Sequence, residues 1–275
     1  MTENNQTPAQ PQRRNLLRNI GLSVGTVGLV SLAGKPALAQ AAASGDPSLI
    51  PSGATTLQEL TARLTATPRR RDFKTVPMIL TSKDQWDDQA INELIAYQGD
   101  PKQVWDNTAL EGPWLNLMRN AVNTQNYSFK KPDYLAVSIT HAAAHLALFD
   151  ETLWDKYKLG ALVKNKSTSN TFILTPSSAA TDPKNFNDPT GVFSPEDNSV
   201  TVLQRRGVVF MGCHNAIWEI SGKILKSGVN PDKLTHPEIA AEFTNHLIPG
   251  AVLTPGVVGT MVYLQKAGYE YAVGQ

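Results

Sequence analysis

Hydrophobic and polar positions follow one another along this chain in blocks that predict strands followed by helices. Short runs rich in β-branched and aromatic residues are typical of buried strands. After most of them, apolar residues recur every three or four positions, as they do on one face of a helix. The predicted strands are 73–81, 134–140, 208–213, 251–253 and 269–273. The predicted helices follow Ser82, Pro113, His141, Ser199, Asn215, Thr235 and Thr254, and residues 100–112 are predicted to be irregular.

Local signals mark several helix boundaries. Ser82 with Gln85, and Thr235 with Glu238, have the capping-box spacing in which two side chains satisfy the first backbone N–H groups of a helix. Gly228 is expected to end the helix that starts beside the single cysteine, because glycine readily adopts the left-handed conformation found at helix ends.

Strands that alternate with helices predict a mostly parallel sheet covered on both faces. We therefore expect a doubly wound α/β domain. In such sheets, ligands bind in the crevice outside the carboxyl ends of the strands. Thr81, His141, Cys213 and Thr254 are expected to emerge at that edge, so it is where we look for a functional site.

Residues 1–39 have the pattern of an export signal. Arg13-Arg14 precedes an apolar stretch over residues 20–33, and Ala37-Leu38-Ala39 forms a cleavage signal. This pattern predicts a twin-arginine (Tat) signal peptide, and hence a secreted protein of the bacterial periplasm. The apolar stretch is short and broken by glycines, and no later stretch is long enough to span a bilayer. We expect no membrane association after cleavage.

The charge balance argues against nucleic acid as a partner. The sequence carries 25 Lys+Arg against 24 Asp+Glu. Residues 1–39 include four basic residues and one acidic residue, which leaves 21 basic against 23 acidic residues after cleavage. A slightly acidic chain is not expected to bind nucleic acid or an anionic membrane. We interpret the triplet Arg69-Arg70-Arg71 as a solvated face.

The remaining chain divides into an arm and one domain. Residues 40–72 are rich in Ala, Ser, Thr and Pro, and we interpret them as a linker or N-terminal arm with a helical segment near 57–64. Residues 73–275 form the predicted α/β domain. Within it, residues 164–198 are polar and contain four prolines, which predicts an irregular insertion. Loops of this length in a compact domain usually serve function.

Cys213 is the only cysteine, so the chain cannot form an internal disulfide. It is expected at the carboxyl end of a strand and beside a helix N-terminus, where backbone N–H groups and the helix dipole favour a thiolate. His141 or His214 is a candidate to deprotonate it. The alternative is a small apolar residue buried in the core, as free cysteines often are.

His141 and His145 are four residues apart, the spacing that places two imidazoles on one helix face. No intervening Glu, third ligand or second cysteine accompanies them, so we predict no metal site, although these two residues are the candidates for one. His141 is a candidate for positioning or proton transfer. The alternative is two histidines packed at a helix start. No cofactor is predicted.

Three segments resemble the C-terminal half of DsrE/DsrF-like proteins. They read GVVFMGCHN at 207–215, IPGAVLTPGV at 248–257 and YLQKAGYEY at 263–271. The likeness is good over 205–273, looser over 73–160 and absent elsewhere. It implies a flavodoxin-like three-layer sandwich that assembles into homo-oligomers. It also implies that Cys213 carries sulfur as a persulfide, with Asn215 at the matching position beside it.

We therefore expect an exported sulfur carrier or sulfurtransferase that uses Cys213. Lacking a second cysteine, it needs a partner protein or a small thiol as sulfur donor and acceptor. The alternative is a non-catalytic periplasmic protein with the same fold, in which the crevice binds a small ligand or cofactor beneath the 164–198 insertion. A metal or haem site at His141 and His145 is a third hypothesis.

Overall fold

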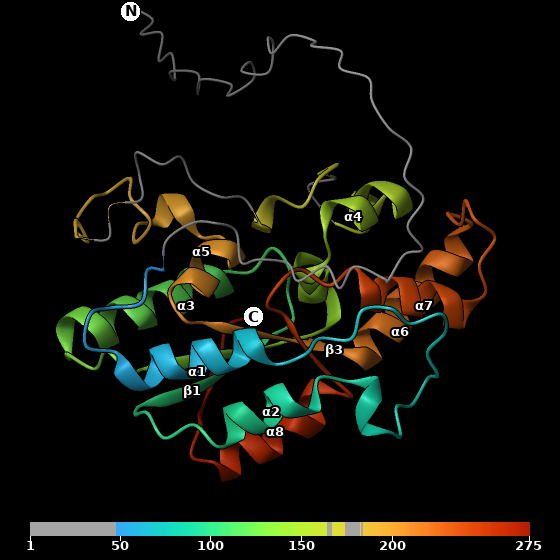
Figure 1. Ribbon diagram of the computed structural model, residues 1–275. Coiled ribbons are helices and arrows are strands. Elements are labelled where there is room, and N and C mark those ends of the chain that lie inside the picture. The colour runs from blue at the N-terminus through green and yellow to red at the C-terminus, as the bar shows by residue number, and fades with distance from the viewer. Residues whose placement is uncertain (1–47, 164–166, 174–181, 183) are drawn as a thin grey trace, which may run out of the picture. The chain divides into compact units, whose positions relative to one another are not determined.

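The computed structural model describes residues 48–163, 167–173, 182 and 184–275, so the predicted export signal lies outside the described residues. The fold is built on a five-stranded parallel sheet in the order β4-β3-β2-β1-β5 (Figure 1). The strands are β1 (Lys102–Asn107), β2 (Leu135–Thr140), β3 (Val209–Cys213), β4 (Val252–Thr254) and β5 (Glu270–Val273). The α-helices are α1 (Thr55–Ala66), α2 (Asp88–Ile95), α3 (Trp114–Asn123), α4 (Glu151–Tyr157), α5 (Val200–Arg205), α6 (His214–Ser227), α7 (His236–Asn245) and α8 (Val257–Lys266).

Helices cover both faces of this sheet. From β1 to β4 the chain steps across the sheet in one direction, and the buried side chains of α3, α4, α6 and α7 form one core with one face. Those of α1, α2 and α8 form a second core with the other face. Figure 1 shows α2 and α8 together on the opposite side of the sheet from α4, α6 and α7. The predicted three-layer α/β sandwich with a parallel sheet is confirmed.

The strand order differs at one edge from the order 2-1-3-4-5 of flavodoxin. Here β5, the last strand, pairs with the outer side of β1, where the second strand of flavodoxin lies. The chain reaches that edge from β4 through α8. Because the loop after β3 leads to α6 on one face and the loop after β4 leads to α8 on the other, the topological switch point lies between β3 and β4.

Side chains along β3 alternate between the two cores, as the period of a strand requires. Phe210 packs in the core formed with α3, α6 and α7. Val209, Met211 and Cys213 pack in the core formed with α1, α2 and α8. The direction of the Cys213 side chain is therefore fixed by strand geometry toward the α2 and α8 layer.

The expected strand at 73–81 is wrong. Phe73 exchanges backbone hydrogen bonds with the side chain of Asn245, and Val76 N–H donates to Pro237 O at 3.2 Å. Pro77 has no N–H to donate to a neighbouring strand. The segment instead lies against α7 and the start of α6, so Thr81 does not follow a strand.

The expectation that 100–112 is irregular is also wrong, since this segment contains β1. The sequence of β1 is mostly polar, so a search for runs of apolar residues does not detect this strand. In the sheet, however, the polar side chains find partners. Asn107 Nδ2 donates to Ser138 Oγ at 2.7 Å, and Lys102 Nζ donates to Tyr97 O at 3.1 Å. Pairing with β2 and β5 on both sides thus stabilises a strand that its own composition does not favour.

The local boundary signals are confirmed. Ser82 and Gln85 form a capping box at the short 3₁₀ helix that precedes α2, and Thr235 and Glu238 form one at α7. α6 ends at Gly228, whose φ is 78°. The helical segment near 57–64 is α1, and its Leu57 and Leu60 are buried in the core with α2.

The buried carboxylate of Asp87 joins the arm, α2 and β4. Its side chain, 1% exposed, accepts from Arg71 Nη1 and Nη2 at 3.1 and 2.8 Å and forms an ion pair with Arg69. It also accepts from Leu253 N–H at 2.7 Å, while its own N–H donates to Leu253 O at 3.0 Å. A solvated face is therefore the wrong interpretation for Arg69 and Arg71. Arg70, by contrast, is exposed and pairs with Asp72 and Asp84.

Replacing this carboxylate should destabilise the fold. Asp87→Ala leaves the two arginines without a counter-charge and the β4 edge without its partner. Removing one member of a buried ion pair typically lowers the free energy of unfolding by about 3–5 kcal/mol. Urea denaturation followed by circular dichroism measures the change. The matched control is Asp84→Ala, which removes an exposed carboxylate and should stay close to wild type; equal losses in both variants would contradict this role.

Candidate functional site

The carboxyl ends of the strands lie in register along one edge of the sheet. Asn107 of β1 aligns with Thr140 of β2, Thr140 with Gly212 of β3, and Cys213 with Thr254 of β4. His141 follows β2 directly, and His214 follows β3. The parallel sheet therefore brings together residues that are widely separated in the sequence, and this edge is the candidate site.

Cys213 is the N-cap residue of the 14-residue helix α6. It lies at the switch point, beside β4, where Thr254 Oγ1 donates to Gly212 O at 3.1 Å. The residue is 5% exposed and packs in the core with Met211 and Val257. Among the described residues, no hydrogen-bond partner of its sulfur is found. The helix N-terminus favours a sulfur anion, while the apolar packing limits access to it.

Asn215 lies close to Gly256, which follows the neighbouring strand β4. It is exposed in the first turn of α6. Its Nδ2 lies 2.8 Å from the position that a Cβ on Gly256 would occupy, so a side chain at Gly256 would displace it. Because Gly256 lies between β4 and α8, this contact spans the switch point. Cys213 and Asn215 therefore both lie at the switch point, Cys213 buried and Asn215 exposed.

His214 is turned away from Cys213. Its ring is fully buried, and its Nε2 lies 2.8 Å from Pro77 O, in the segment that was expected to be a strand. Burial lowers the pKa of His214, and hydrogen bonds to the backbone of Pro77 and Met78 oppose this shift. Its Nδ1 has no hydrogen-bond partner among the described residues. The segment 73–81 thus covers this histidine, and the Nε2 atom of His214 hydrogen-bonds to that segment.

His141, which follows β2, is linked through hydrogen bonds to polar side chains of β1 and β5. Its Nε2 lies 2.8 Å from Asp106 Oδ1, and Tyr271 Oη donates to Asp106 Oδ2 at 2.9 Å. This hydrogen bond raises the pKa of Tyr271. A carboxylate that holds one imidazole nitrogen fixes the ring's orientation and directs the other nitrogen elsewhere. His141 is partly exposed, so Nδ1 is the nitrogen available to a ligand or to solvent.

Sequence reasoning missed Asp106 and Tyr271. Asp106 lies in β1, which was expected to be irregular, and nothing local indicates that β5 pairs with β1. One signal was present, because Tyr271 ends the YLQKAGYEY segment that resembles the DsrE/DsrF family. Its role as a partner of Asp106 depends on strand order, which that segment does not encode.

His145 does not share a site with His141. It lies in the 3₁₀ helix Ala142–Leu148 and is fully buried, and neither ring nitrogen has a hydrogen-bond partner in the part of the chain that the structure describes. Burial lowers the pKa of His145 to about 3. Its Nε2 lies 3.1 Å from the position of a Cβ on Gly212, which points to the opposite face of the sheet from Cys213. No group of three or more His, Cys, Asp or Glu suited to a metal occurs among the described residues.

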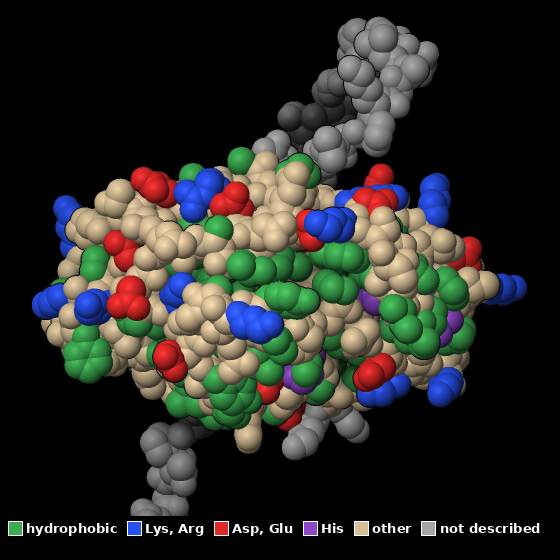
Figure 2. All heavy atoms as spheres, turned by 90° about the horizontal axis from the view of Figure 1, so that it is seen from below, with side chains coloured by type: hydrophobic (Ala, Val, Ile, Leu, Met, Phe, Trp, Pro, Cys, Tyr) green, Lys and Arg blue, Asp and Glu red, His purple; other side chains and the backbone are tan. Residues whose placement is uncertain are grey.

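The surface around these elements mixes charges of both signs. Figure 2 shows the face that is turned downward in Figure 1, where Lys and Arg side chains lie apart from one another among acidic and apolar ones. Apolar side chains are exposed on α8, at Val258, Val262 and Tyr263, and on β5, at Tyr271 and Val273. Within the described ranges, no helix has the length and apolarity to cross a membrane.

Comparison of the chain with protein-family models, curated proteins and solved structures found no significant match. The likeness to DsrE/DsrF proteins therefore rests on the three sequence segments alone. Any chemical role must therefore be argued from the geometry of the carboxyl ends of the strands.

The burial of His145 predicts a loss of stability in acid. In the unfolded chain this histidine takes up a proton as the pH falls below about 6.5, whereas in the folded protein its pKa is about 3. The free energy of unfolding should therefore fall as the pH drops from 6.5 to 5, by ~2 kcal/mol for this residue. Denaturant titrations at several pH values measure the slope. His145→Leu should flatten it in this range, and an unchanged slope in that variant would contradict the assignment.

Proposed function

We propose that this protein is an exported DsrE/DsrF-like sulfur carrier in which Cys213 holds sulfane sulfur as a persulfide. The observation that carries the proposal is the position of the only cysteine, at the N-terminus of a long helix and at the switch point of a parallel sheet. Ligands of open α/β sheets bind at such points. The flavodoxin-like layers and the likeness over residues 205–273 support it.

The transfer step is a thiol exchange without net oxidation. The thiolate of Cys213 attacks the terminal sulfur of a persulfide donor, R–S–SH. A new S–S bond forms on Cys213 while the donor's S–S bond breaks, and the donor leaves as the thiolate R–S⁻. An acceptor thiolate then removes the terminal sulfur from Cys213 in the same way. Because the chain has one cysteine, donor and acceptor are other molecules, either a partner protein or a small thiol.

Three neighbouring groups have distinct roles in this proposal. The N–H groups at the start of α6 favour the anionic sulfur. The exposed amide of Asn215 lies beside Gly256 at the switch point, where it can hydrogen-bond to the incoming donor. The ring of His141 is oriented by Asp106 and forms no hydrogen bond with Cys213. We therefore assign His141 the role of contacting the donor or acceptor molecule at the same edge.

Access to Cys213 requires a local opening, because the residue is 5% exposed. The β4-to-α8 loop at Thr254–Val257 is the part that must move, since it packs against the cysteine from the neighbouring strand. Sulfur loading should therefore be slower in the folded protein than in the denatured chain.

Intact-mass analysis tests the carrier role. After incubation with inorganic polysulfide, the full chain should gain the mass of one sulfur atom, and dithiothreitol should remove it. Cys213→Ser is expected to gain none, while Asn215→Ala should load more slowly with an unchanged circular dichroism spectrum. A wild-type protein that gains no mass when folded but gains it in urea would refute the proposal and show that the thiol is only a core residue.

One observation favours the second candidate, a non-catalytic periplasmic binding protein with this fold. Cys213 packs in one core with Met211 and Val257, as an ordinary core residue would. In that case, Cys213→Ser should retain the protein's ligand affinity, and folded wild-type protein should accept no sulfur. The same mass measurement therefore separates the two functions.

A further inference from the structure

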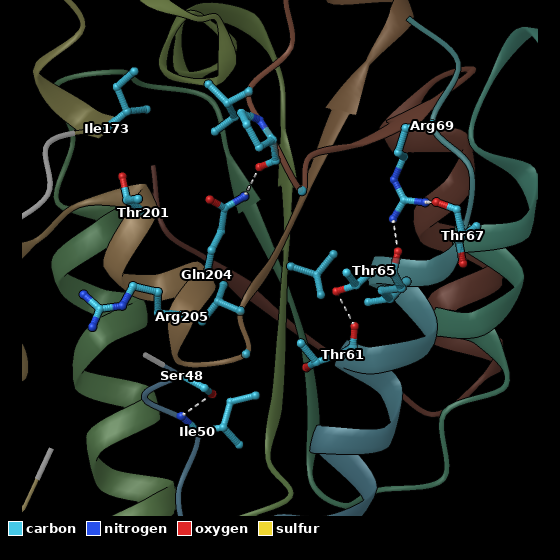
Figure 3. Close-up of a pocket in the computed structure, with 17 residues that line it drawn as sticks. Ser48, Ile50, Thr61, Thr65, Thr67, Arg69, Ile173, Thr201, Gln204 and Arg205 are labelled. Carbon is cyan, nitrogen blue, oxygen red and sulfur yellow. Dashed lines mark hydrogen bonds between the residues drawn. The ribbon is translucent and has the colours of Figure 1, made fainter. Parts of the chain in front are cut away.

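A groove lies at the amino ends of the strands, at the opposite end of the sheet from Cys213. Residues of α1 line one side and residues of α5 line the other, and the floor is formed where β3 begins and by the turn before β4 (Figure 3). The groove has a volume of about 410 Å³, within the range of pockets that bind small molecules. The sequence pattern predicted a site only at the carboxyl ends of the strands.

The floor of the groove is apolar. Val208 and Val209 line it where β3 begins, and Ile248 and Pro249 line it from the turn before β4. Gln204 of α5 donates its Nε2 to Pro249 O at 2.9 Å, which ties this turn to α5. Such a floor favours a hydrocarbon chain, because covering it removes apolar surface from water.

The hydroxyl groups on the α1 side are already satisfied. Thr61, Thr65 and Thr67 each donate to the backbone carbonyl four residues earlier, at 2.9, 2.8 and 2.8 Å. A ligand therefore gains contacts from this side but few new hydrogen bonds.

The N-terminal arm borders the same groove. Leu49 N–H donates to Arg205 O at 2.9 Å, and this bond fixes the neighbouring Ser48 and Ile50, which line the groove. The Ser48 hydroxyl accepts a hydrogen bond from Ile50 N–H at 3.3 Å. This hydroxyl is therefore also engaged within the protein.

Both cationic side chains that line the groove have partners within the protein. Arg69 donates to backbone carbonyls at the end of α1 and forms an ion pair with Asp87. Arg205 is attracted to the carboxylate of Asp197. Among the described residues, no Asp or Glu lines the groove. A charged ligand would lose its hydration here without gaining a free counter-charge, so the groove favours an uncharged ligand.

The hydroxyl of Thr201 differs from the others in the groove. Thr201 lies on the α5 side, as Figure 3 shows, and its Oγ1 is buried without a hydrogen-bond partner in the described part of the chain. A buried hydroxyl that donates to no acceptor costs free energy, which a ligand with an acceptor oxygen recovers. A carbonyl oxygen supplies such an acceptor without bringing a charge.

We propose that this groove binds an uncharged amphipathic carbonyl compound, such as a medium-chain ketone or ester. The carbonyl oxygen accepts a hydrogen bond from Thr201, and the hydrocarbon chain lies over Val208 and Ile248 against the α1 side. The site is independent of the sulfur carrier, because it lies at the amino ends of the strands and shares no residue with the surroundings of Cys213.

Calorimetric titration of the full chain with 2-nonanone tests this site. The ketone should bind once per chain. Octanoate has the same number of heavy atoms but is ionised at neutral pH, and should bind about tenfold more weakly or not at all. Equal or tighter binding of octanoate overturns the assignment to an uncharged ligand.

Two positions locate the ketone within the groove. Thr65→Trp, which places a large ring in the groove from the exposed surface of α1, should weaken 2-nonanone binding by about tenfold or more. Thr201→Val keeps the shape but removes the hydroxyl, and should weaken binding by about fivefold. Thr201→Ser retains the hydroxyl and should bind more tightly than Thr201→Val. Equal affinity in the wild type and Thr201→Val overturns the hydrogen bond to the carbonyl.

Two further variants serve as controls. Ala66→Trp adds the same ring at an exposed position of α1 that does not line the groove, and should leave the affinity for 2-nonanone unchanged. Cys213→Ser should also leave it unchanged, which separates this site from the sulfur carrier. Absence of saturable binding, or equal affinity in the wild type and Thr65→Trp, overturns the proposal.

Discussion

The buried carboxylate of Asp87 accepts a hydrogen bond from the edge strand β4, and the rest of the structure depends on this contact. β4 has only three residues and forms one border of the sheet, where unpaired backbone groups would otherwise be exposed. Asp87 bonds to both the N–H and the C=O of Leu253, through its side chain and its own N–H. Two arginines from the arm neutralise its charge. This arrangement supports β4 beside β3, and the pairing of Cys213 with Thr254 depends on those two strands staying together.

The same two strands organise both ends of the molecule. At their carboxyl ends the chain leaves toward opposite faces, and Cys213 and Asn215 lie where the two paths diverge. At their amino ends, a groove is lined by residues of α1, of α5 and of the start of β3. Opposite ends of one strand pair thus offer two different environments, a buried cysteine at one end and a groove between two helices at the other.

The histidines show that spacing along a chain does not decide the role of a side chain. His141 and His145 are four residues apart, yet one is held by Asp106 at the surface and the other is buried without a hydrogen-bond partner among the described residues. His214, adjacent to the cysteine, bonds to Pro77. Burial and the nearest acceptor determine the state of each ring, and both come from parts of the chain far away in sequence.

The sequence by itself determined the features that depend only on residues close together along the chain. The strand–helix alternation predicts the parallel α/β fold, and the capping boxes at Ser82 and Thr235 predict two helix starts, because each signal is complete within a few residues. The tertiary structure decided what depends on pairing at a distance. β1 is a strand despite its polar sequence because β2 and β5 hydrogen-bond to both of its sides, and 73–81 is not a strand despite its apolar sequence because its backbone partners lie on α7 and α6. The contact between Asp106 and Tyr271 joins residues 165 positions apart, and only the order of the strands brings them together.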